Sequence, residues 1–137
     1  MTMPDVNAVV RKYLIGNADI VAFFAPDLPR VFCPRLPENT KLPAIGLFVR
    51  GGSSTPYIPP LVSPSFQIDC WHNNSIGARS LYLATYSALQ GIQNVAVVIA
   101  PNTYYIKSAR EEVQGQDLID DITGYFRVLA FFEIKIS

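Results

Sequence analysis

The sequence predicts an α+β fold, with a mostly antiparallel sheet of about five strands and two or three helices packed on one face. Three observations lead to this prediction. Segment 65–72 alternates between apolar and polar residues, a helical spacing follows within a few residues, and helices and strands do not alternate regularly along the chain. With 137 residues, the chain has the length of one domain, so we expect residues 1–137 to form a single unit.

The N-terminal part predicts two helices and a short strand. Asp5 favours the start of a helix, apolar residues follow at helical spacing, and Gly16 ends it. Residues 18–24 form a second, short helix that Pro26 breaks. Residues 30–33 read as a brief strand with a proline on each side, which favours a sheet edge.

The centre of the domain is a strand that passes directly into a helix. Segments 44–50 and 65–72 read as partner strands, and alternate apolar residues of the second turn to one side: Phe66, Ile68 and Cys70. Asn74 or Ser75 can cap the helix that follows, and Gly91 supplies a left-handed stop.

Between the two partner strands, residues 51–64 are rich in Gly, Ser and Pro and predict an extended loop. At about fourteen residues it is longer than ordinary hairpin loops of roughly 2–5 residues. Its apolar residues favour contact with a surface, so we expect it to be an arm that packs on a neighbouring subunit or another protein. The residues proposed for that contact are Ser54, Thr55, Tyr57, Ile58 and Leu61.

The C-terminal part predicts three more strands, at 94–100, 103–110 and 124–136. In the second, strict alternation places Ile106 and Ser108 on one face and Lys107 and Ala109 on the other. Residues 111–123 read as an acidic loop. Its carboxylates are Glu111, Glu112, Asp117, Asp120 and Asp121.

The composition favours assembly. Half of the residues are hydrophobic and only 16% are charged, against about 25% in typical soluble domains. Apolar surface is therefore expected to be buried against other subunits, although a compact monomer with an uncharged polar surface is the alternative. Basic and acidic residues cancel, so nothing indicates a strong nucleic-acid binder. No apolar run approaches the ~20 residues of a membrane span, and we expect no signal peptide.

The sequence shows no catalytic or metal-binding motif. The single histidine, His72, lies three residues from Asp69 and on the opposite face of the same predicted strand. Cys33, Cys70 and His72 are fewer than the four ligands usual for structural zinc, and the two cysteines are expected to be buried free thiols. We therefore expect no enzyme, no cofactor and no metal.

Two further patterns have some features of binding motifs. The Gly51–Gly52 pair is not followed by the Lys-Ser/Thr of a phosphate-binding loop, and the acidic segment does not match the spacing of a calcium loop. Solvated or lumen-facing charge is the favoured interpretation of that segment. The tyrosines and phenylalanines of the C-terminal strands are interpreted as core and interface residues.

Taken in order, these features resemble the tail terminator (tail completion, or tail-to-head joining) proteins of long-tailed phages. The resemblance is carried by the strand LPAIGLFVRGG at 42–52, by SFQIDCWHNNSIGARSLYLATYSAL at 65–89, and by GYFRVLAFFEIKI at 124–136. In that family a strand of the type Q-I-D-x-W runs directly into an alanine-rich helix, as residues 67–71 do here. The extended loop departs from the shorter versions of the family.

The resemblance implies a structural role in the virion. It implies a hexameric ring that caps the tail tube, ends its polymerisation and docks the head connector, with assembly in the host cytoplasm. The partners would be further copies of the chain, the tail tube protein and a connector or neck protein, while DNA passes through the bore without specific binding. Carboxylates that line the bore would repel the phosphate backbone, which suggests this role for Glu111, Glu112, Asp117, Asp120 and Asp121.

Two alternatives stay open at this point. The chain could be another morphogenesis part, such as a head-completion or neck protein or the tube protein itself. It could also be a small-molecule-binding α+β domain or enzyme, which would need a pocket with convergent polar groups.

Overall fold

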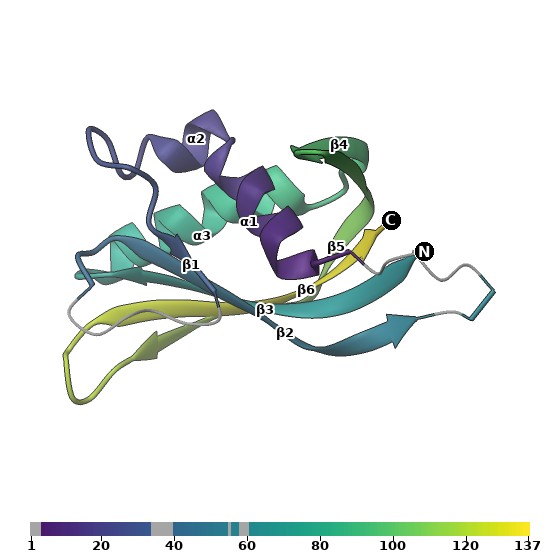
Figure 1. Ribbon diagram of the computed structural model, residues 1–137. Coiled ribbons are helices and arrows are strands. Elements are labelled where there is room, and N and C mark those ends of the chain that lie inside the picture. The colour runs from purple at the N-terminus through teal and green to yellow at the C-terminus, as the bar shows by residue number, and fades with distance from the viewer. Residues whose placement is uncertain (1–3, 34–39, 55, 58–60) are drawn as a thin grey trace.

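The computed structural model describes residues 4–33, 40–54, 56–57 and 61–137. Six strands form one curved sheet in the order β1-β2-β3-β6-β5-β4. All described helices lie on the same side of this sheet, as Figure 1 shows, so none of them covers the other side. The fold is therefore a mixed α/β structure in two layers, and the predicted placement of the helices on one face is confirmed.

The two N-terminal helices begin where the sequence predicts. Helix α1 spans Val6–Ile15, and the Asp5 carboxylate accepts a hydrogen bond from the Ala8 amide at 3.4 Å. Helix α2 spans Ala18–Val21 and is capped by Asn17, whose side chain accepts from two amides of the first turn. The Tyr13 hydroxyl of α1 donates to the carbonyl of Ala88, which ties this helix to the central one.

The centre of the fold is the predicted strand and helix. Strand β2 (Ala44–Ser54) pairs antiparallel with β3 (Val62–His72), and helix α3 (Ser75–Leu89) follows at once. Asn74 is the N-cap residue of α3, with its side-chain oxygen 2.6 Å from the Gly77 nitrogen. Gly91 has a φ of +80°, the left-handed conformation expected after the helix.

The C-terminal half is a meander of three long strands. Strand β4 (Gln93–Ile99) pairs with β5 (Asn102–Ile119), which pairs with β6 (Phe126–Ile136), and β6 closes the sheet against β3. The core lies between the sheet and the helices. Alternate residues of the two central strands are buried there: Phe66, Ile68, Cys70, Phe132, Ile134 and Ile136. Each such fully buried side chain contributes roughly 1.5–3 kcal/mol.

Three predictions need correction. Within the described residues the sheet has six strands and not about five, and the predicted edge segment 30–33 is one of them: β1 (Val31–Phe32) joins the sheet in parallel. The Ile45 amide donates to the Arg30 carbonyl at 2.8 Å, which adds a backbone hydrogen bond beside this two-residue strand. The pair is parallel, with Val31 opposite Ile45 and Phe32 opposite Gly46.

The predicted loop 51–64 is shorter in the structure, because both flanking strands extend into it. Gly51 and Gly52 have φ values of +101° and +124°, which let the chain shift register, and β2 then continues to Ser54. Ser54 pairs with Val62, so part of the expected loop is the end of a long hairpin. Residues 55 and 58–60, and with them Thr55 and Ile58, lie outside the described residues.

The predicted acidic loop 111–123 is mostly strand. Strand β5 runs to Ile119 because its partner β6 continues to pair with it as far as Phe126. Register shifts lie between Ile106 and Ser108 and within residues 111–116. The first shift turns Ile106 and Ala109 both into the core, so the strict alternation expected for this strand is wrong.

Candidate assembly surfaces

We define the open face as the side of the sheet away from the helices. Successive residues of a strand point to opposite faces, so the open face carries the residues that alternate with the core residues. Among them are the half-buried side chains of Phe48, Trp71, Leu129 and Phe131. Arginines cover two of these rings: Arg127 stacks over Trp71 at 5.1 Å and Arg50 over Phe131 at 5.3 Å from the ring centre. The open face is therefore a mixed aromatic and charged surface.

Asp69 is the most buried charged group of this face, with 7% of its surface exposed. Burial raises the pKa of its carboxyl group, while Arg127 and a hydrogen bond from Gln67 act in the opposite direction. The Arg127 guanidinium lies 3.9 Å from a carboxylate oxygen, so the charge is only partly compensated.

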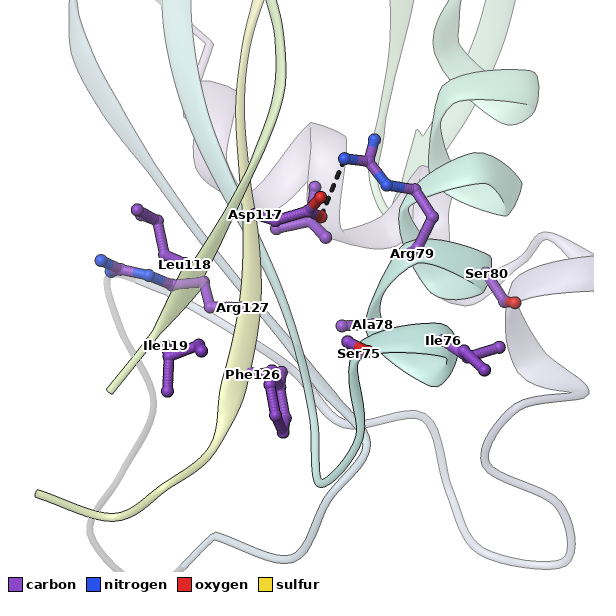
Figure 2. A pocket seen from close by; sticks show the side chains of 11 residues that line it. Ser75, Ile76, Ala78, Arg79, Ser80, Asp117, Leu118, Ile119, Phe126 and Arg127 are labelled. Atoms are coloured by element: carbon purple, nitrogen blue, oxygen red, sulfur yellow. Dashed lines mark hydrogen bonds and ion pairs between the residues drawn. The ribbon is translucent and has the colours of Figure 1, made fainter. Parts of the chain in front are cut away.

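A second feature is a groove between the start of α3 and the end of the β5–β6 hairpin. It measures about 450 Å³, with Ser75, Ile76 and Arg79 on the helix side and Ile119, Phe126 and Val128 on the strand side. Figure 2 shows Arg79 reaching across from α3 to Asp117, and the two groups form an ion pair at 2.8 Å. The groove is mainly apolar, with this ion pair among its lining.

Large apolar side chains are exposed at both ends of the sheet. At one end, Ile122 in the β5–β6 turn is 96% exposed and Ile119 is 62% exposed. At the other end, Tyr57 beyond the β2–β3 hairpin is 91% exposed. Of the predicted contact residues, Ser54 ends strand β2 and is exposed, whereas Leu61 is half-buried.

The five carboxylates proposed for a bore do not lie together. Glu111 accepts a hydrogen bond from Tyr82 of α3 and Asp117 pairs with Arg79, so both face the helices. Glu112 lies on the open face, where it accepts from the Ser65 hydroxyl at 2.7 Å. Asp120 and Asp121 lie in the turn after β5. Asp120 accepts from the Ile122 amide at 2.9 Å, which lowers the pKa of its carboxyl group.

The histidine and the two cysteines considered as catalytic or metal-binding groups lie among ordinary packing contacts. The His72 ring packs against Gly77, where an added Cβ would lie 2.6 Å from ring carbons, and its Nδ1 is 3.3 Å from the side-chain Nδ2 of Asn74. Cys70 is buried against Thr85, and burial raises the pKa of its thiol to about 12. Cys33 is half-buried, with a thiol pKa raised by burial to about 11. Both thiols are free and protonated at neutral pH.

Among the described residues, no group of three or more His, Cys, Asp and Glu side chains lies close enough to hold a metal ion. Within the same residues, no helix has the length and apolar character needed to span a bilayer.

Sequence reasoning missed the groove and the stacked arginines. Ile76 and Ile119 are 43 residues apart in the chain, and only the antiparallel return of β6 brings their elements to one end of the sheet. Arg127 and Trp71 face each other across β3 and β6. The alternation of Trp71 opposite to Phe66, Ile68 and Cys70 was the signal that could have indicated a second, aromatic face.

The fold is that of a chain in a solved structure described as the virion of a native gene transfer agent (GTA) particle. The TM-score is 0.65 at 14% sequence identity, and the likeness covers 96% of this chain and 93% of the other. No protein-family model and no curated protein matches the sequence. At this identity, the similarity establishes a shared fold.

Proposed function

We propose that this chain is a structural protein of a phage or phage-like virion, and that it forms a ring, hexameric in our proposal, that caps the tail tube. In this role it ends tube polymerisation and presents the surface to which a head connector docks. The observation that carries the proposal is the fold shared over nearly the full length of both chains with a chain of a gene transfer agent virion. The resemblance of residues 65–89 to tail terminator proteins supports the finer role.

The surface of the chain supports an assembly function. Large apolar side chains are exposed at 80% or more at Ile76, Tyr57 and Ile122, and the open face adds half-buried aromatic rings. Exposed apolar groups of this kind are typical of surfaces that other proteins cover. The low share of charged residues, 16%, fits the same interpretation.

We also propose that carboxylates of this chain line the bore of the ring. Glu111 and Asp117 are engaged by side chains of α3, so a bore-lining role fits Glu112, Asp120 and Asp121 better. Carboxylates at such positions would repel DNA and let it pass without sticking. Rings that carry Asp120→Lys and Asp121→Lys should then retain short duplex DNA at low salt, whereas wild-type rings should not. Equal retention by both would contradict a bore role for these residues.

The groove is also large enough for a small ligand, since ligand sites span roughly 300–1,000 Å³. Its charged pair, Arg79 and Asp117, is however already joined at 2.8 Å. The other polar side chains of its lining are Ser75, Ser80 and Arg127, and the exposed surface of the groove is mainly apolar. The groove therefore supports contact with an apolar surface better than it supports small-molecule chemistry.

The deciding experiment is the mass and shape of the purified protein. Light scattering after size-exclusion chromatography should give about 91 kDa for six copies of the 15.2 kDa chain. Negative-stain electron microscopy should show closed rings that bind the ends of tail tubes. Open tubes would assign the chain to the tube protein instead, rings that bind only the head connector would assign it to the neck, and a monomer would contradict the proposal.

A further inference from the structure

The outer edge of strand β4 is a free sheet edge. Strand β4 is the last strand of the sheet and pairs on one side only, with β5, in a regular register from Gln93 to Ile99. Within the described residues, no hydrogen bond joins the other side of its backbone to another part of the chain. Such an edge presents N–H and C=O groups with which a further extended backbone can pair.

The other strand edges are short, interrupted or already satisfied. At the opposite end of the sheet, β1 has only 2 residues. The outer edge of β2 carries the charged Arg50 and a register shift, and both features discourage pairing. In β5 beyond its pairing with β4, the amides of Glu111 and Gly115 donate to side chains from α3 and its C-cap. Strand β4, with the sequence QNVAVVI, has neither a charge nor a register shift.

A second groove, which we call the α1–β4 groove, lies along this edge and measures about 400 Å³. One wall is the end of α1, with Lys12, Tyr13, Gly16 and the following Asn17, and the other is residues 95–98 of β4. Figure 1 shows β4 at the end of the curved sheet, on the side of the helices. Successive residues of a strand point to opposite faces, so a groove lined by four consecutive residues follows the edge of the strand.

The backbone and the charge of the α1–β4 groove select its occupant. Free backbone groups along an edge are matched by an extended polypeptide, and a groove between a strand and a helix can receive such a segment as an added strand. Among the described lining residues only Lys12 is charged, and it forms no ion pair with any residue that the structure describes. This positive charge favours a segment that carries a carboxylate.

The β4 edge of a second copy fits the α1–β4 groove less well. Its sequence, QNVAVVI, brings no carboxylate. A two-fold contact between two β4 edges would also bring Lys12 of both copies to the same interface, where like charges repel.

We propose that the α1–β4 groove binds an extended segment of a different protein, which adds a strand to the free edge of β4 and places an acidic side chain against Lys12. Small or apolar residues at alternate positions of that segment would continue the apolar surface formed by Val95 and Val97 on one face of β4 and by Val98 on the other. Strand addition at this edge does not depend on whether the chain forms a ring.

Synthetic peptides test the strand addition. The probes match β4 in length, with 7 residues of alternating threonine and valine and blocked ends, and one glutamate is moved along the set to cover the possible registers. Fluorescence anisotropy with the purified full chain should show saturable binding of at least one peptide. N-methylation of every second amide removes the donors of one peptide edge and should weaken binding at least about tenfold. Methylation of the other amides is the matched control and should retain binding, because the pairing edge stays free.

A charge exchange tests the role of Lys12. Lys12→Glu should weaken binding of the glutamate peptide by about threefold to fivefold, and a peptide with lysine in place of its glutamate should restore binding to this variant. Lys135→Glu is the matched control, since Lys135 is also exposed but does not line the α1–β4 groove. Binding of the glutamate peptide to Lys12→Glu as tight as to wild type would overturn the assignment of an acidic segment.

Hydrogen exchange locates the bound peptide. The amides of residues 95–98 that point away from β5 should exchange more slowly when the peptide is present. The amides of Glu111 and Gly115 already donate to side chains and should be unchanged.

Three results would overturn the proposed strand addition: no binding of any peptide at millimolar concentration, equal binding of both methylated forms, or slower exchange outside β4 only. Protection of residues 95–98 that rises with the concentration of the protein alone would identify a second copy as the occupant and overturn it too. A protein that forms rings but binds no peptide loses only the strand addition. A monomer that binds the peptide along β4 retains the strand addition and contradicts the ring.

Discussion

The hydroxyl of Tyr82 on α3 donates a hydrogen bond to the carboxylate of Glu111 on β5 and accepts a hydrogen bond from the Gly115 amide at 3.1 Å. One side chain thus satisfies a charged group and a backbone amide of an irregular strand. Burial, together with the hydrogen bond to Glu111, raises the pKa of Tyr82 to about 12. This link explains why an acidic residue can lie on the helix-facing side of β5.

Removal of this hydroxyl should destabilise the fold. Tyr82→Phe leaves the Glu111 carboxylate and the Gly115 amide without this partner, and we expect a loss of about 1–2 kcal/mol in the free energy of unfolding. Urea unfolding followed by circular dichroism measures it. Tyr125→Phe, at an exposed position near the β5–β6 turn, is the matched control and should change stability by less than about 0.5 kcal/mol. Equal stability of the two variants would contradict the role of the link.

The same residue should make stability depend on pH in the alkaline range. The pKa of Tyr82 is about 12 in the folded protein against 10.0 for an ordinary tyrosine, so the folded state holds the proton that the unfolded state has lost. This contribution is complete below pH 10.0 and declines as the pH rises toward 12. Unfolding free energies measured between pH 9 and 11.5 should therefore fall more steeply for wild type than for Tyr82→Phe. If the unfolding free energies of wild type and Tyr82→Phe fell in parallel with pH, the pKa of Tyr82 would be the same in the folded and unfolded states.

Gly115 should tolerate no side chain. An added Cβ would lie 2.7 Å from a Val128 methyl carbon and 2.8 Å from the Tyr82 ring, so Gly115→Ala should cost about 1–3 kcal/mol. Gly16→Ala is the matched control, because its Cβ would meet only backbone oxygens at 3.5 Å and beyond and its φ of −90° suits alanine. Thermal melts should show a lower midpoint for Gly115→Ala only; a midpoint equal to that of the control would argue against the tight contact.

The start of α3 should depend on Asn74. Its side chain accepts from the Gly77 amide at 2.6 Å, and Asn74→Ala should cost about 1 kcal/mol, since that amide then loses its side-chain acceptor. Asn74→Asp keeps the acceptor and should remain within about 0.5 kcal/mol of wild type. Chemical denaturation of the three proteins checks this. A loss for Asn74→Asp as large as that for Asn74→Ala would show that the cap is not the reason.

Local patterns in the sequence determined the elements and their caps. Asp5 and Asn74 cap the starts of their helices, and Gly91 takes the left-handed conformation after α3, as local sequence predicts. Phe66, Ile68 and Cys70 are buried, as their alternation predicts. These features need only the few residues on either side of each position, which is why they can be read without the fold.

Tertiary structure decided where the strands end and which residues meet. Glycine and acidic composition predicted loops at 51–64 and 111–123, yet pairing with β3 and β6 extends β2 and β5 into both, because ladder hydrogen bonds outweigh weak local preference. The register shift in β5 turns Ile106 and Ala109 to the same side, and Tyr82 from a distant helix satisfies Glu111. Contacts between residues far apart in the chain depend on the register of every intervening strand, and no single segment contains that information.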